Sequence, residues 1–544
     1  MASFYVQNFG CRATQADGAA IERQFTELGL KPAVAPEKAG IVVLNTCTVT
    51  SAADQDARAA IRRLRRDNPA CQIVVTGCYA QRAPQEVASL PGVTAVIGNA
   101  HKHQVANCLL PLQAAGMRHS DESGAGSLKP EPYRQASGPV PPPPGSSSFV
   151  PIGALAAHYG GLNNEQPVTQ PARLLVSDIF AHTELVAAPV FEAASDRTRP
   201  NLKVQDGCNN RCSFCIIPFV RGLSRSLPLA EVIREVNRLV AAGYREVVIS
   251  GINLGRWGRD LELFSPPSSL ASRASETRKS GCPVARFEDL VRAVLSETGL
   301  EKLRISSVEP MDWSDELLDL MQASPRIAQH AHVPMQSGSD RILRAMHRRY
   351  RPWHYREKVE NIRSAMPTAA IGADVMVGFP GESDSDFDLT RRMIAELPLT
   401  YLHVFTYSSR PGTRAATMPN HIPVEVARER NRILRTLAAE KQSQFMTHFL
   451  GKTLEAITLR GCDGEATEAL TDNYLKLRIR ERVEPNQWMA VRVEQIVDGR
   501  LVGSVHSQEA LAKAPSSASC QEPQSPNAKP LTNPSLTAEL RQRN

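Results

Sequence analysis

The sequence of 544 residues lacks any apolar run long enough to cross a membrane. Its longest runs, such as residues 41–44, fall far short of the ~18 residues that a membrane-spanning helix needs. The amino terminus lacks a basic stretch followed by an apolar one, so we expect no signal peptide. A strong excess of either charge is also missing, because 63 Lys and Arg face 56 Asp and Glu, and the net charge of +7 permits a polyanionic partner without requiring one. We therefore expect a cytoplasmic protein that inserts no segment into a membrane.

Length and composition predict several folded domains. At roughly 100–200 residues per domain, the chain corresponds to about three or four domains. Apolar residues make up 42% and charged residues 22%, which excludes a wholly disordered or collagen-like chain. Seven prolines fall between Pro130 and Pro144, so residues 109–195 are expected to form a linker or a disordered insert. Residues 265–281 are expected to be a surface excursion, and residues 507–544, rich in Ser, Pro, Gln and Asn, a disordered tail.

Alternating strand and helix patterns predict an α/β protein. In residues 1–108, apolar runs at 4–7, 41–45 and 72–77 are separated by helical patterns at 19–30 and 54–66, which favours a parallel sheet. Residues 196–447 favour a TIM-like barrel or a partial (β/α)6 barrel, because six strand-like runs alternate with helical patterns, at 201–205, 246–250, 302–307, 330–334, 374–379 and 402–407. A basic helical pattern follows at 425–442. Residues 450–506 contain short alternating strands and indicate a small all-β barrel.

Three cysteines follow the expected strand 201–205 with the spacing CxxxCxxC: Cys208, Cys212 and Cys215. A structural zinc site normally needs four protein ligands, and no fourth cysteine or obvious histidine lies nearby in the sequence. Three thiolates can instead hold three irons of a [4Fe–4S] cluster and leave the fourth iron open to a substrate. The spacing therefore favours an iron–sulfur cluster over zinc or a buried structural trio.

Three more cysteines are distant in the sequence, yet Cys11, Cys47 and Cys78 each lie just beyond the carboxyl end of an expected strand. Those ends share one edge of a parallel sheet, where ligands usually bind, so the thiols can converge without a local motif. Gly10 and Gly77 ease the turns that would let the backbone approach a bound group. The residues alone leave two interpretations open, a cluster site or three buried thiols. The remaining cysteines fit neither arrangement and receive no role: Cys71, Cys108, Cys282, Cys462 and Cys520.

These motifs carry a family resemblance. CNNRCSFC (208–215), after a strand that opens a β/α barrel, resembles the radical S-adenosylmethionine (SAM) enzymes. NFGC (8–11), NTCTVT (45–50) and TGCYAQ (76–81) resemble the methylthiotransferases among them, and residues 450–506 resemble the TRAM domain. The resemblance covers residues 1–108 and 196–506. It implies an N-terminal methylthiotransferase domain, a radical SAM domain over 196–447 and an RNA-binding TRAM-like domain over 450–506.

The resemblance also implies the cofactors and the chemistry. It implies two [4Fe–4S] clusters, a catalytic one on Cys208, Cys212 and Cys215 and an auxiliary one on Cys11, Cys47 and Cys78. The catalytic cluster would chelate SAM and cleave it reductively to a 5′-deoxyadenosyl radical, which can abstract hydrogen from an unactivated carbon. The auxiliary cluster would present sulfur, and a second SAM would supply the methyl group. Such an enzyme needs an electron donor, such as flavodoxin or ferredoxin, and a sulfur source.

Loops at the carboxyl ends of barrel strands are expected to bind SAM, since that face hosts the sites of such folds. In this chain they are residues 251–255, 306–310, 336–340 and 378–382. Glu309 and Gln336 are candidates for contact with the ribose or the amino-acid part of SAM, with helix capping or loop hydrogen bonds as the alternative.

Two other positions bear on the expected sites. Arg348 and Arg349 could meet a carboxylate or a phosphate, or form an exposed basic helix face. Thr14 stands where the family commonly has Asn, three residues after the first auxiliary cysteine, which leaves open how that cluster is supported.

The substrate expectation follows from the same resemblance. NTCTVT, SGINLG (250–255) and HVFTYSSRPGT (403–413) resemble most the branch that acts on tRNA at threonylcarbamoyladenosine 37, in the anticodon loop. We therefore expect methylthiolation at carbon 2 of that base, ahead of isopentenyladenosine 37 and of an aspartate of a ribosomal protein. An RNA-binding iron–sulfur protein without turnover is disfavoured, because an open three-cysteine cluster has little purpose without a ligand.

One strand-like stretch, residues 474–482, is a candidate RNA-binding surface. A two-residue period puts one aromatic and four cations on one face: Tyr474, Lys476, Arg478, Arg480 and Arg482. An aromatic beside cations suits a nucleic-acid backbone and a stacked base. The alternative is a solvated strand face, because residues 451–505 as a whole carry 8 basic and 9 acidic residues.

Overall fold

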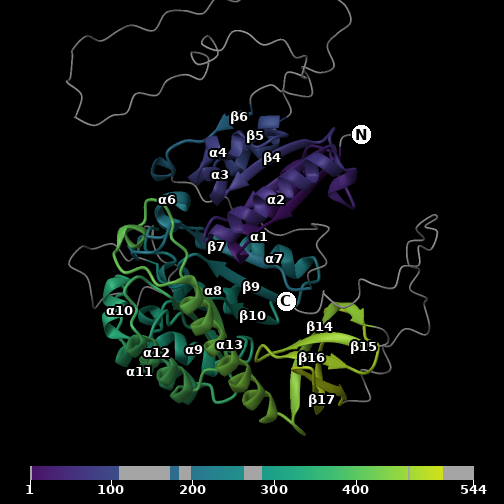
Figure 1. Ribbon diagram of the computed structural model, residues 1–544. Helices are drawn as coiled ribbons and strands as arrows, with labels where there is room; N and C mark the ends of the chain where they lie inside the picture. Colours follow the sequence, from purple (N-terminus) through teal and green to yellow (C-terminus); the bar gives the residue numbers. More distant parts are fainter. Residues whose placement is uncertain (1–2, 110–171, 183–197, 262–284, 464–465, 507–544) are drawn as a thin grey trace, which may run out of the picture. The chain divides into compact units, whose positions relative to one another are not determined.

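The computed structural model describes residues 3–109, 172–182, 198–261, 285–463 and 466–506 (Figure 1). The chain divides into two compact units. The first is Met1–His448 together with Asp472–Leu475, and the second is Phe449–Thr471 together with Lys476–Asn544. The expectations for residues 265–281 and 507–544, and for most of 109–195, lie outside the described ranges. Within those ranges, no helix combines the length and the apolar character that crossing a bilayer requires.

The first unit opens with a parallel sheet of six strands in the order β2-β1-β3-β4-β5-β6. Their bounds are β1 (Ser3–Asn8), β2 (Lys31–Pro32), β3 (Ile41–Thr46), β4 (Gln72–Gly77), β5 (Val93–Ile97) and β6 (Arg173–Leu175). The expected strands at 4–7, 41–45 and 72–77 are confirmed as β1, β3 and β4. The expectation that residues 109–195 are irregular throughout is wrong at β6, since three residues are too few to show a periodic pattern.

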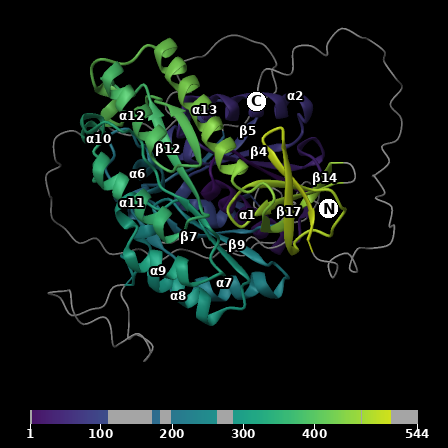
Figure 2. The ribbon, with the colours of Figure 1, turned by 90° about the horizontal axis from the view of Figure 1, so that it is seen from below.

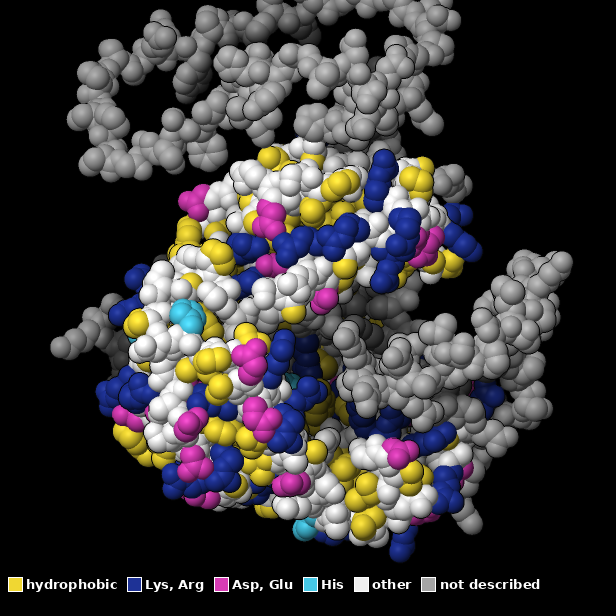
Figure 3. All heavy atoms as spheres, in the orientation of Figure 1, with side chains coloured by type: hydrophobic (Ala, Val, Ile, Leu, Met, Phe, Trp, Pro, Cys, Tyr) yellow, Lys and Arg dark blue, Asp and Glu magenta, His cyan; other side chains and the backbone are white. Residues whose placement is uncertain are grey.

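Helices cover both faces of this sheet, which is why its central strand β3 is buried along its whole length. Their bounds are α1 (Arg12–Glu27), α2 (Ser51–Asp67), α3 (Cys78–Arg82) and α4 (Pro84–Ala88). Helix α2 buries Ala57, Ile61 and Leu64, spaced by three or four residues, and exposes Arg62, Arg63, Arg65 and Arg66. Figure 3 shows Lys and Arg side chains gathered over this helix.

Six parallel strands then form a partial barrel, as expected from the sequence. They are β7 (Asn201–Asp206), β9 (Glu246–Gly251), β10 (Lys302–Ile305), β11 (His330–His332), β12 (Ala370–Val377) and β13 (Tyr401–Thr406). Two isolated parallel bridges, Leu303 with Ile327 and Ser307 with His332, join the two three-strand parts. The short strand β8 (Arg225–Ser226) pairs with β7 in the antiparallel direction. Within the described ranges, β7 and β13 do not pair, so the barrel stays open there.

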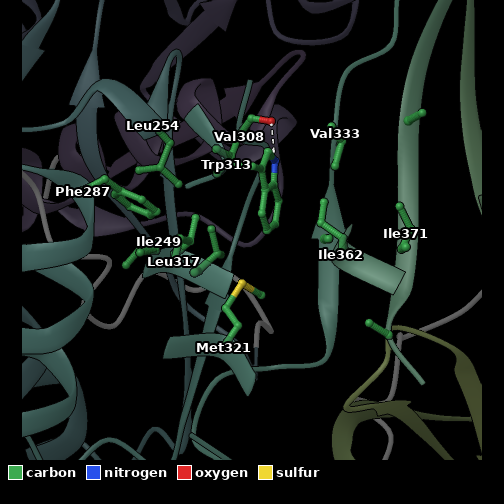
Figure 4. Close-up of a cluster of buried hydrophobic side chains, with 14 of the residues drawn as sticks. Ile249, Leu254, Phe287, Val308, Trp313, Leu317, Met321, Val333, Ile362 and Ile371 are labelled. Atoms are coloured by element: carbon green, nitrogen blue, oxygen red, sulfur yellow. Dashed lines mark hydrogen bonds between the residues drawn. The ribbon is translucent and has the colours of Figure 1, made fainter. Parts of the chain in front are cut away.

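Helices surround the outside of the strands (Figure 2). They are α7 (Leu229–Ala241), α8 (Phe287–Glu297), α9 (Asp315–Ala323), α10 (Asp340–Ala345), α11 (Pro352–Ala365), α12 (Asp384–Glu396) and α13 (Val424–Thr447). The short helix α6 (Ile217–Arg221) lies instead against α3 of the N-terminal sheet. The main core lies between these helices and the outward side chains of the strands. In Figure 4, Phe287, Leu317 and Met321 pack near Ile249, and the buried indole of Trp313 donates a hydrogen bond of 3.1 Å to the backbone oxygen of Val308. The expected basic helix at 425–442 is confirmed within α13.

The second unit is a small closed barrel, which confirms the expected all-β domain. Its strands run in the order β14-β15-β16-β18-β17, with β17 pairing back to β14. The bounds are β14 (Thr453–Asp463), β15 (Ala466–Thr471), β16 (Lys476–Ile479), β17 (Trp488–Val497) and β18 (Arg500–Val505). Alternate residues fill its interior, for example Leu477, Ile479, Val491 and Val493.

Candidate functional site

The CxxxCxxC loop begins where β7 ends, at the carboxyl edge of the barrel. Gly207, with φ of +69°, makes the turn, and a Cβ there would lie 1.9 Å from the backbone oxygen of Leu223. Only glycine fits such a close approach at a positive φ. The backbone N–H of Cys208 then donates to the oxygen of Gly222 at 3.1 Å, which fixes the start of the loop.

Polar groups are aimed at the sulfur atoms of this triad. The side-chain amide of Asn253 donates to Sγ of Cys208 at 3.6 Å, and Nη1 of Arg348 donates to Sγ of Cys212 at 3.3 Å. Desolvation and the neighbouring Cys212 raise the pKa of Cys215 to about 12. Thiols of this kind hold their protons until a metal displaces them, so metal binding here releases protons.

A hollow beside Cys212 contains several residues from neighbouring loops. Its lining includes Asn210, Arg256, Glu309 and Arg348. Arg348 is buried and pairs with the Glu309 carboxylate, while its Nε donates to the hydroxyl of Tyr350 at 3.2 Å. Burial raises the pKa of Glu309, and Arg348 opposes that shift. The hollow therefore combines a carboxylate and guanidinium groups next to a thiol of the triad.

The other expected residues of this edge fall differently. Gln336, whose φ is +61°, joins the sheet through its backbone. Its N–H donates to the oxygen of Asp374 at 2.8 Å, and its oxygen accepts from the N–H of Met376 at 2.9 Å. Gln336 does not line the hollow beside Cys212. The alternative of an exposed helix face for Arg348 and Arg349 is wrong, because α10 ends at Ala345 and Arg348 is buried; Arg349 is exposed and lines the same hollow.

The second triad lies at one edge of the N-terminal sheet. Cys11 is the N-cap of α1 after β1, Cys47 follows β3, and Cys78 is the first residue of α3 after β4. Because β1, β3 and β4 are neighbours in a parallel sheet, their carboxyl ends meet.

The two glycines expected at these turns are both needed. A Cβ on Gly10, with φ of +102°, would lie 2.6 Å from Cβ of Cys47. A Cβ on Gly77, with φ of +99°, would lie 2.3 Å from the backbone oxygen of Thr46. Glycine thus brings the loop of Cys11 against Cys47 and the loop of Cys78 against the end of β3.

The three thiols share one electrostatic environment. The pKa of Cys47 is raised to about 12, mainly by desolvation and secondly by the neighbouring Cys78. Thr14, the departure from the family pattern, is buried with its hydroxyl 3.5 Å from Sγ of Cys11 and from Nη2 of Arg221. A hydroxyl can donate to a sulfur or accept from a guanidinium, so Thr14 lies within hydrogen-bond reach of both Cys11 and Arg221.

Helix α6 connects the two triads. Ile216, Ile217 and Val220 form an apolar cluster with Cys78, and Cys208 and Cys215 pack against it. Asn99 extends the link, since its side-chain amide donates to the Val220 oxygen at 2.5 Å and lies 3.8 Å from Sγ of Cys78. The two cysteine sites are therefore packed against the same apolar helix.

A buried ionic network lies beside this helix. The Asp17 carboxylate on α1 accepts from Lys102 at 2.6 Å, from Arg221 at 3.0 Å and from Lys203 of β7. Asp206 accepts from Lys203 at 2.8 Å and from Arg221 at 3.0 Å. The sequence motifs gave no indication of this network, because its members come from segments up to 204 positions apart. It holds α1 of the N-terminal sheet against the first barrel strand.

Part of the strand face expected over residues 474–482 is present in the structure, while RNA binding by it stays a prediction. Lys476, Arg478 and Arg480 do alternate with buried Leu477 and Ile479 in and beside β16. Arg478, Arg480 and Arg500 line one open hollow of the small barrel, and Arg482 is exposed beyond the strand. Tyr474 is the exception. It sits before the strand in a turn with φ of +66°, where its ring packs 4.4 Å from that of His330 within the first unit.

Comparisons with known proteins agree with this arrangement. Residues 202–394 match the description "Radical SAM superfamily", and residues 3–98 match "Uncharacterized protein family UPF0004". The threonylcarbamoyladenosine tRNA methylthiotransferase MtaB of Bacillus subtilis is 31% identical, covering 88% of this chain and 90% of the relative. A tRNA-2-methylthio-N(6)-dimethylallyladenosine synthase of Novosphingobium aromaticivorans is 30% identical over 84% of this chain and 87% of its own. Among solved structures, the radical SAM methyltransferase TsrM of Kitasatospora setae is 14% identical with a TM-score of 0.46, over 76% of this chain and 75% of its own.

The open (β/α)6 barrel with a three-cysteine loop after its first strand defines a radical SAM enzyme. The N-terminal sheet that carries a second set of cysteines narrows the class further. The chain belongs to the MiaB/MtaB-type family of radical SAM methylthiotransferases.

Proposed function

We propose that this chain methylthiolates carbon 2 of N6-threonylcarbamoyladenosine at position 37 of tRNA. Relatives that carry this activity in their names span most of the chain, for example at 31% identity in Bacillus subtilis and in Aquifex aeolicus. The observation that carries the proposal is the apolar cluster around α6, in which Cys78 of one triad packs with Cys208 and Cys215 of the other. Sulfur insertion into a carbon activated by a radical requires the two sites to be close, and this cluster supports that.

Two [4Fe–4S] clusters fit the two triads. The donors aimed at Cys208 and Cys212 and the glycine turn beneath Cys208 suit charged sulfur ligands at the barrel edge. At the sheet edge, the glycine turns beside Cys47 and Cys78 likewise let the backbone come close to the second triad. When bound, the first cluster would supply the electron that cleaves SAM, and the second would supply a sulfur site.

The side chains near the first triad would position SAM. Arg348 and Glu309 pair in the hollow beside Cys212, so each would present its remaining donors or acceptors in a fixed orientation to the amino-acid and ribose parts of SAM. Arg256, whose guanidinium pairs with Asp312 at 3.0 Å, lines the same hollow. The proposed work of the chain is to orient SAM and to exclude water from it.

The proposal includes three external partners. The tRNA anticodon loop is the substrate, and its base 37 is single-stranded, so it can be turned out at low cost. Arg478, Arg480 and Arg500 of the small barrel would meet phosphates of that RNA. A one-electron donor, such as flavodoxin or ferredoxin, and a sulfur source complete the reaction.

Nucleoside mass spectrometry tests the proposal. The anaerobically reconstituted enzyme is incubated with SAM, a reductant and two tRNAs, one with threonylcarbamoyladenosine 37 and one with isopentenyladenosine 37. We expect the methylthio product from the first tRNA only. A product from the isopentenyl tRNA, or activity on a ribosomal-protein aspartate and on neither tRNA, would reassign the substrate. An RNA-binding protein without turnover would yield no 5′-deoxyadenosine.

A further inference from the structure

The inner face of β11, β12 and β13 carries a polar and aromatic wall that neither cysteine site uses. Along β12, Ile371, Ala373, Val375 and Val377 belong to the outer core, so the alternate residues face inward. Leu402 and Val404 of β13 pack on the same core, which turns their neighbours inward as well. The inward set includes His330, His332, Asp374, Tyr401, His403 and Phe405.

Hydrogen bonds fix the polar members of this wall. Oδ1 of Asp374 lies 3.1 Å from Nε2 of His332 and 3.2 Å from Nδ1 of His403. On its other side, Nδ1 of His332 lies 3.0 Å from the hydroxyl of Tyr401, which lies 2.7 Å from Nε2 of His330. Desolvation disfavours the charged carboxylate, but the hydrogen bonds from His332 and His403 outweigh it and hold the pKa of Asp374 well below its usual value. The Asp374 side chain is therefore ionised and held in one orientation.

Three groups on this wall remain available. Both imidazoles meet the same oxygen of Asp374, so within the described part of the chain Oδ2 has no hydrogen-bond partner. The His403 side chain is 52% exposed, and its Nε2 likewise has no partner among the described residues. Phe405, two residues further along the same strand face, is 48% exposed and lies with its ring centroid 6.4 Å from that of His403.

This wall is close to the proposed SAM site. The backbone oxygen of His332 accepts from the N–H of Val308 at 3.1 Å, and Val308 directly precedes Glu309. Glu309 in turn pairs with Arg348, which contacts Cys212. An occupant of the wall would thus lie beside the hollow in which the radical is expected to form.

We propose that this wall is the binding site for the adenine base turned out of the RNA. Phe405 stacks on the base, Oδ2 of Asp374 accepts the hydrogen of its exocyclic amine, and Nε2 of His403 contacts the substituent on that amine. Unstacked bases are commonly held in this way, by an aromatic face and hydrogen bonds to one edge. The proposal rests on the proposed function, since it assumes a purine substrate, but it does not depend on which modified adenosine is used.

Binding measurements with anticodon stem-loops test the assignment. The probes are short RNAs with adenine or purine at position 37, purine being the analogue that lacks the exocyclic amine. Fluorescence anisotropy with the cluster-loaded enzyme should show adenine bound at least about ten-fold more tightly, as expected for a hydrogen bond to a charged acceptor. In D374A that preference should disappear, because both RNAs then lack the same contact. Equal binding of both RNAs by the unmodified chain, or an unchanged preference in D374A, would overturn the proposal.

A second set of variants separates stacking from damage to the fold. F405L should weaken binding of both RNAs by about ten-fold, as loss of one stacked base predicts, and F405W should restore it. W353L serves as the matched control, because Trp353 is 56% exposed but lies on α11 outside the barrel. The affinity of W353L for both RNAs should not change. Failure of F405W to restore binding would contradict the stacking role.

A metal ion is the competing occupant, because the ligand atoms of His332, Asp374 and His403 lie within 4.8 Å of one another. Metal analysis of the cluster-loaded enzyme after exposure to Zn²⁺ decides between the two. We expect the same zinc content in the unmodified chain and in H403A. If the unmodified chain binds one zinc and H403A binds none, the base-binding proposal is wrong. The binding tests involve no turnover, so a failure of the threonylcarbamoyl assignment would leave their outcome unaffected.

Discussion

At the scale of single residues, Arg348 connects the first cysteine triad to its neighbourhood. It contacts Sγ of Cys212 and pairs with Glu309, and its removal would leave a partly buried carboxylate without its cation. We expect R348M to lower the free energy of unfolding by about 1–3 kcal/mol and to weaken SAM binding. Urea denaturation and calorimetric titration with SAM measure the two effects.

The matched double variant identifies the cause. Gln at position 309 needs no cation, so E309Q with R348M should be more stable than R348M alone. If the second change adds a further loss instead, the pairing of Arg348 and Glu309 does not account for the effect.

Asp17 is the residue on which the buried ionic network depends. Its carboxylate is desolvated, but Lys102, Lys203 and Arg221 hold its pKa well below the usual value. A depressed pKa adds stability above about pH 4, the value in the unfolded chain, and that stability is lost as the pH falls. We therefore expect D17N to be destabilised by about 3–5 kcal/mol at pH 7, since Lys102 loses its carboxylate and Lys203 and Arg221 keep only Asp206. Denaturation of the cluster-free chain should show this difference shrinking below about pH 4; a constant difference would contradict the electrostatic cause.

The sequence predicted some site residues and not others for a physical reason. Cys208, Cys212 and Cys215 share one loop, so their spacing is visible in the chain, and Cys11, Cys47 and Cys78 are marked by the strands that precede them. No local pattern marks Asp17, Arg221 or Asp374, because their partners come from other elements. Tyr474 was placed wrongly because a two-residue period was extended two positions before the strand begins.

At the scale of elements, most strands were predicted, but β5 was missed although VTAVI is largely apolar, and the short or mixed strands β2 and β15 were missed too. Strands β3 and β9 are almost wholly buried, so nearly every position is apolar or small. Strand β15, ATEALT, and the two-residue β2 carry no such run, and they form because neighbouring strands supply their hydrogen bonds. Tertiary context thus decides these elements.

Strand β16 yields a prediction at the same scale. Arg478 lines an open hollow with Arg500. Arg480 lies 3.1 Å from Glu494, so part of the Arg480 charge is compensated. We expect R478A with R480A to weaken tRNA binding and to reduce the slope of log affinity against log salt by about one to two phosphate contacts. Filter binding between low and moderate salt measures both.

A charge-matched control accompanies this test. R428A with R435A removes two cations from α13 of the first unit and should leave the slope unchanged. An unaltered affinity and slope in the β16 variant would mean that the strand face is merely solvated.

At the scale of the whole molecule, the first unit holds both cysteine triads against one apolar helix, while each triad keeps its own backbone frame. The first depends on the loop after β7, and the second on the edge shared by β1, β3 and β4. Separate frames should make the two sites separable by mutation, although the chemistry requires both.

Cysteine variants test that separation. C208A should abolish SAM cleavage to 5′-deoxyadenosine, whereas C47A should retain cleavage and lose sulfur insertion, because only the first triad is proposed to meet SAM. Iron analysis should give about eight irons for the unmodified chain and about four when Cys11, Cys47 and Cys78 are all replaced by Ala, since each [4Fe–4S] cluster holds four. C71A is the matched control, because Cys71 is buried in the core of the N-terminal sheet away from either triad, and its iron content should equal that of the unmodified chain. An unchanged iron content in the triple variant would show that the second triad holds no cluster, and loss of SAM cleavage in C47A would show that the two sites do not act separately.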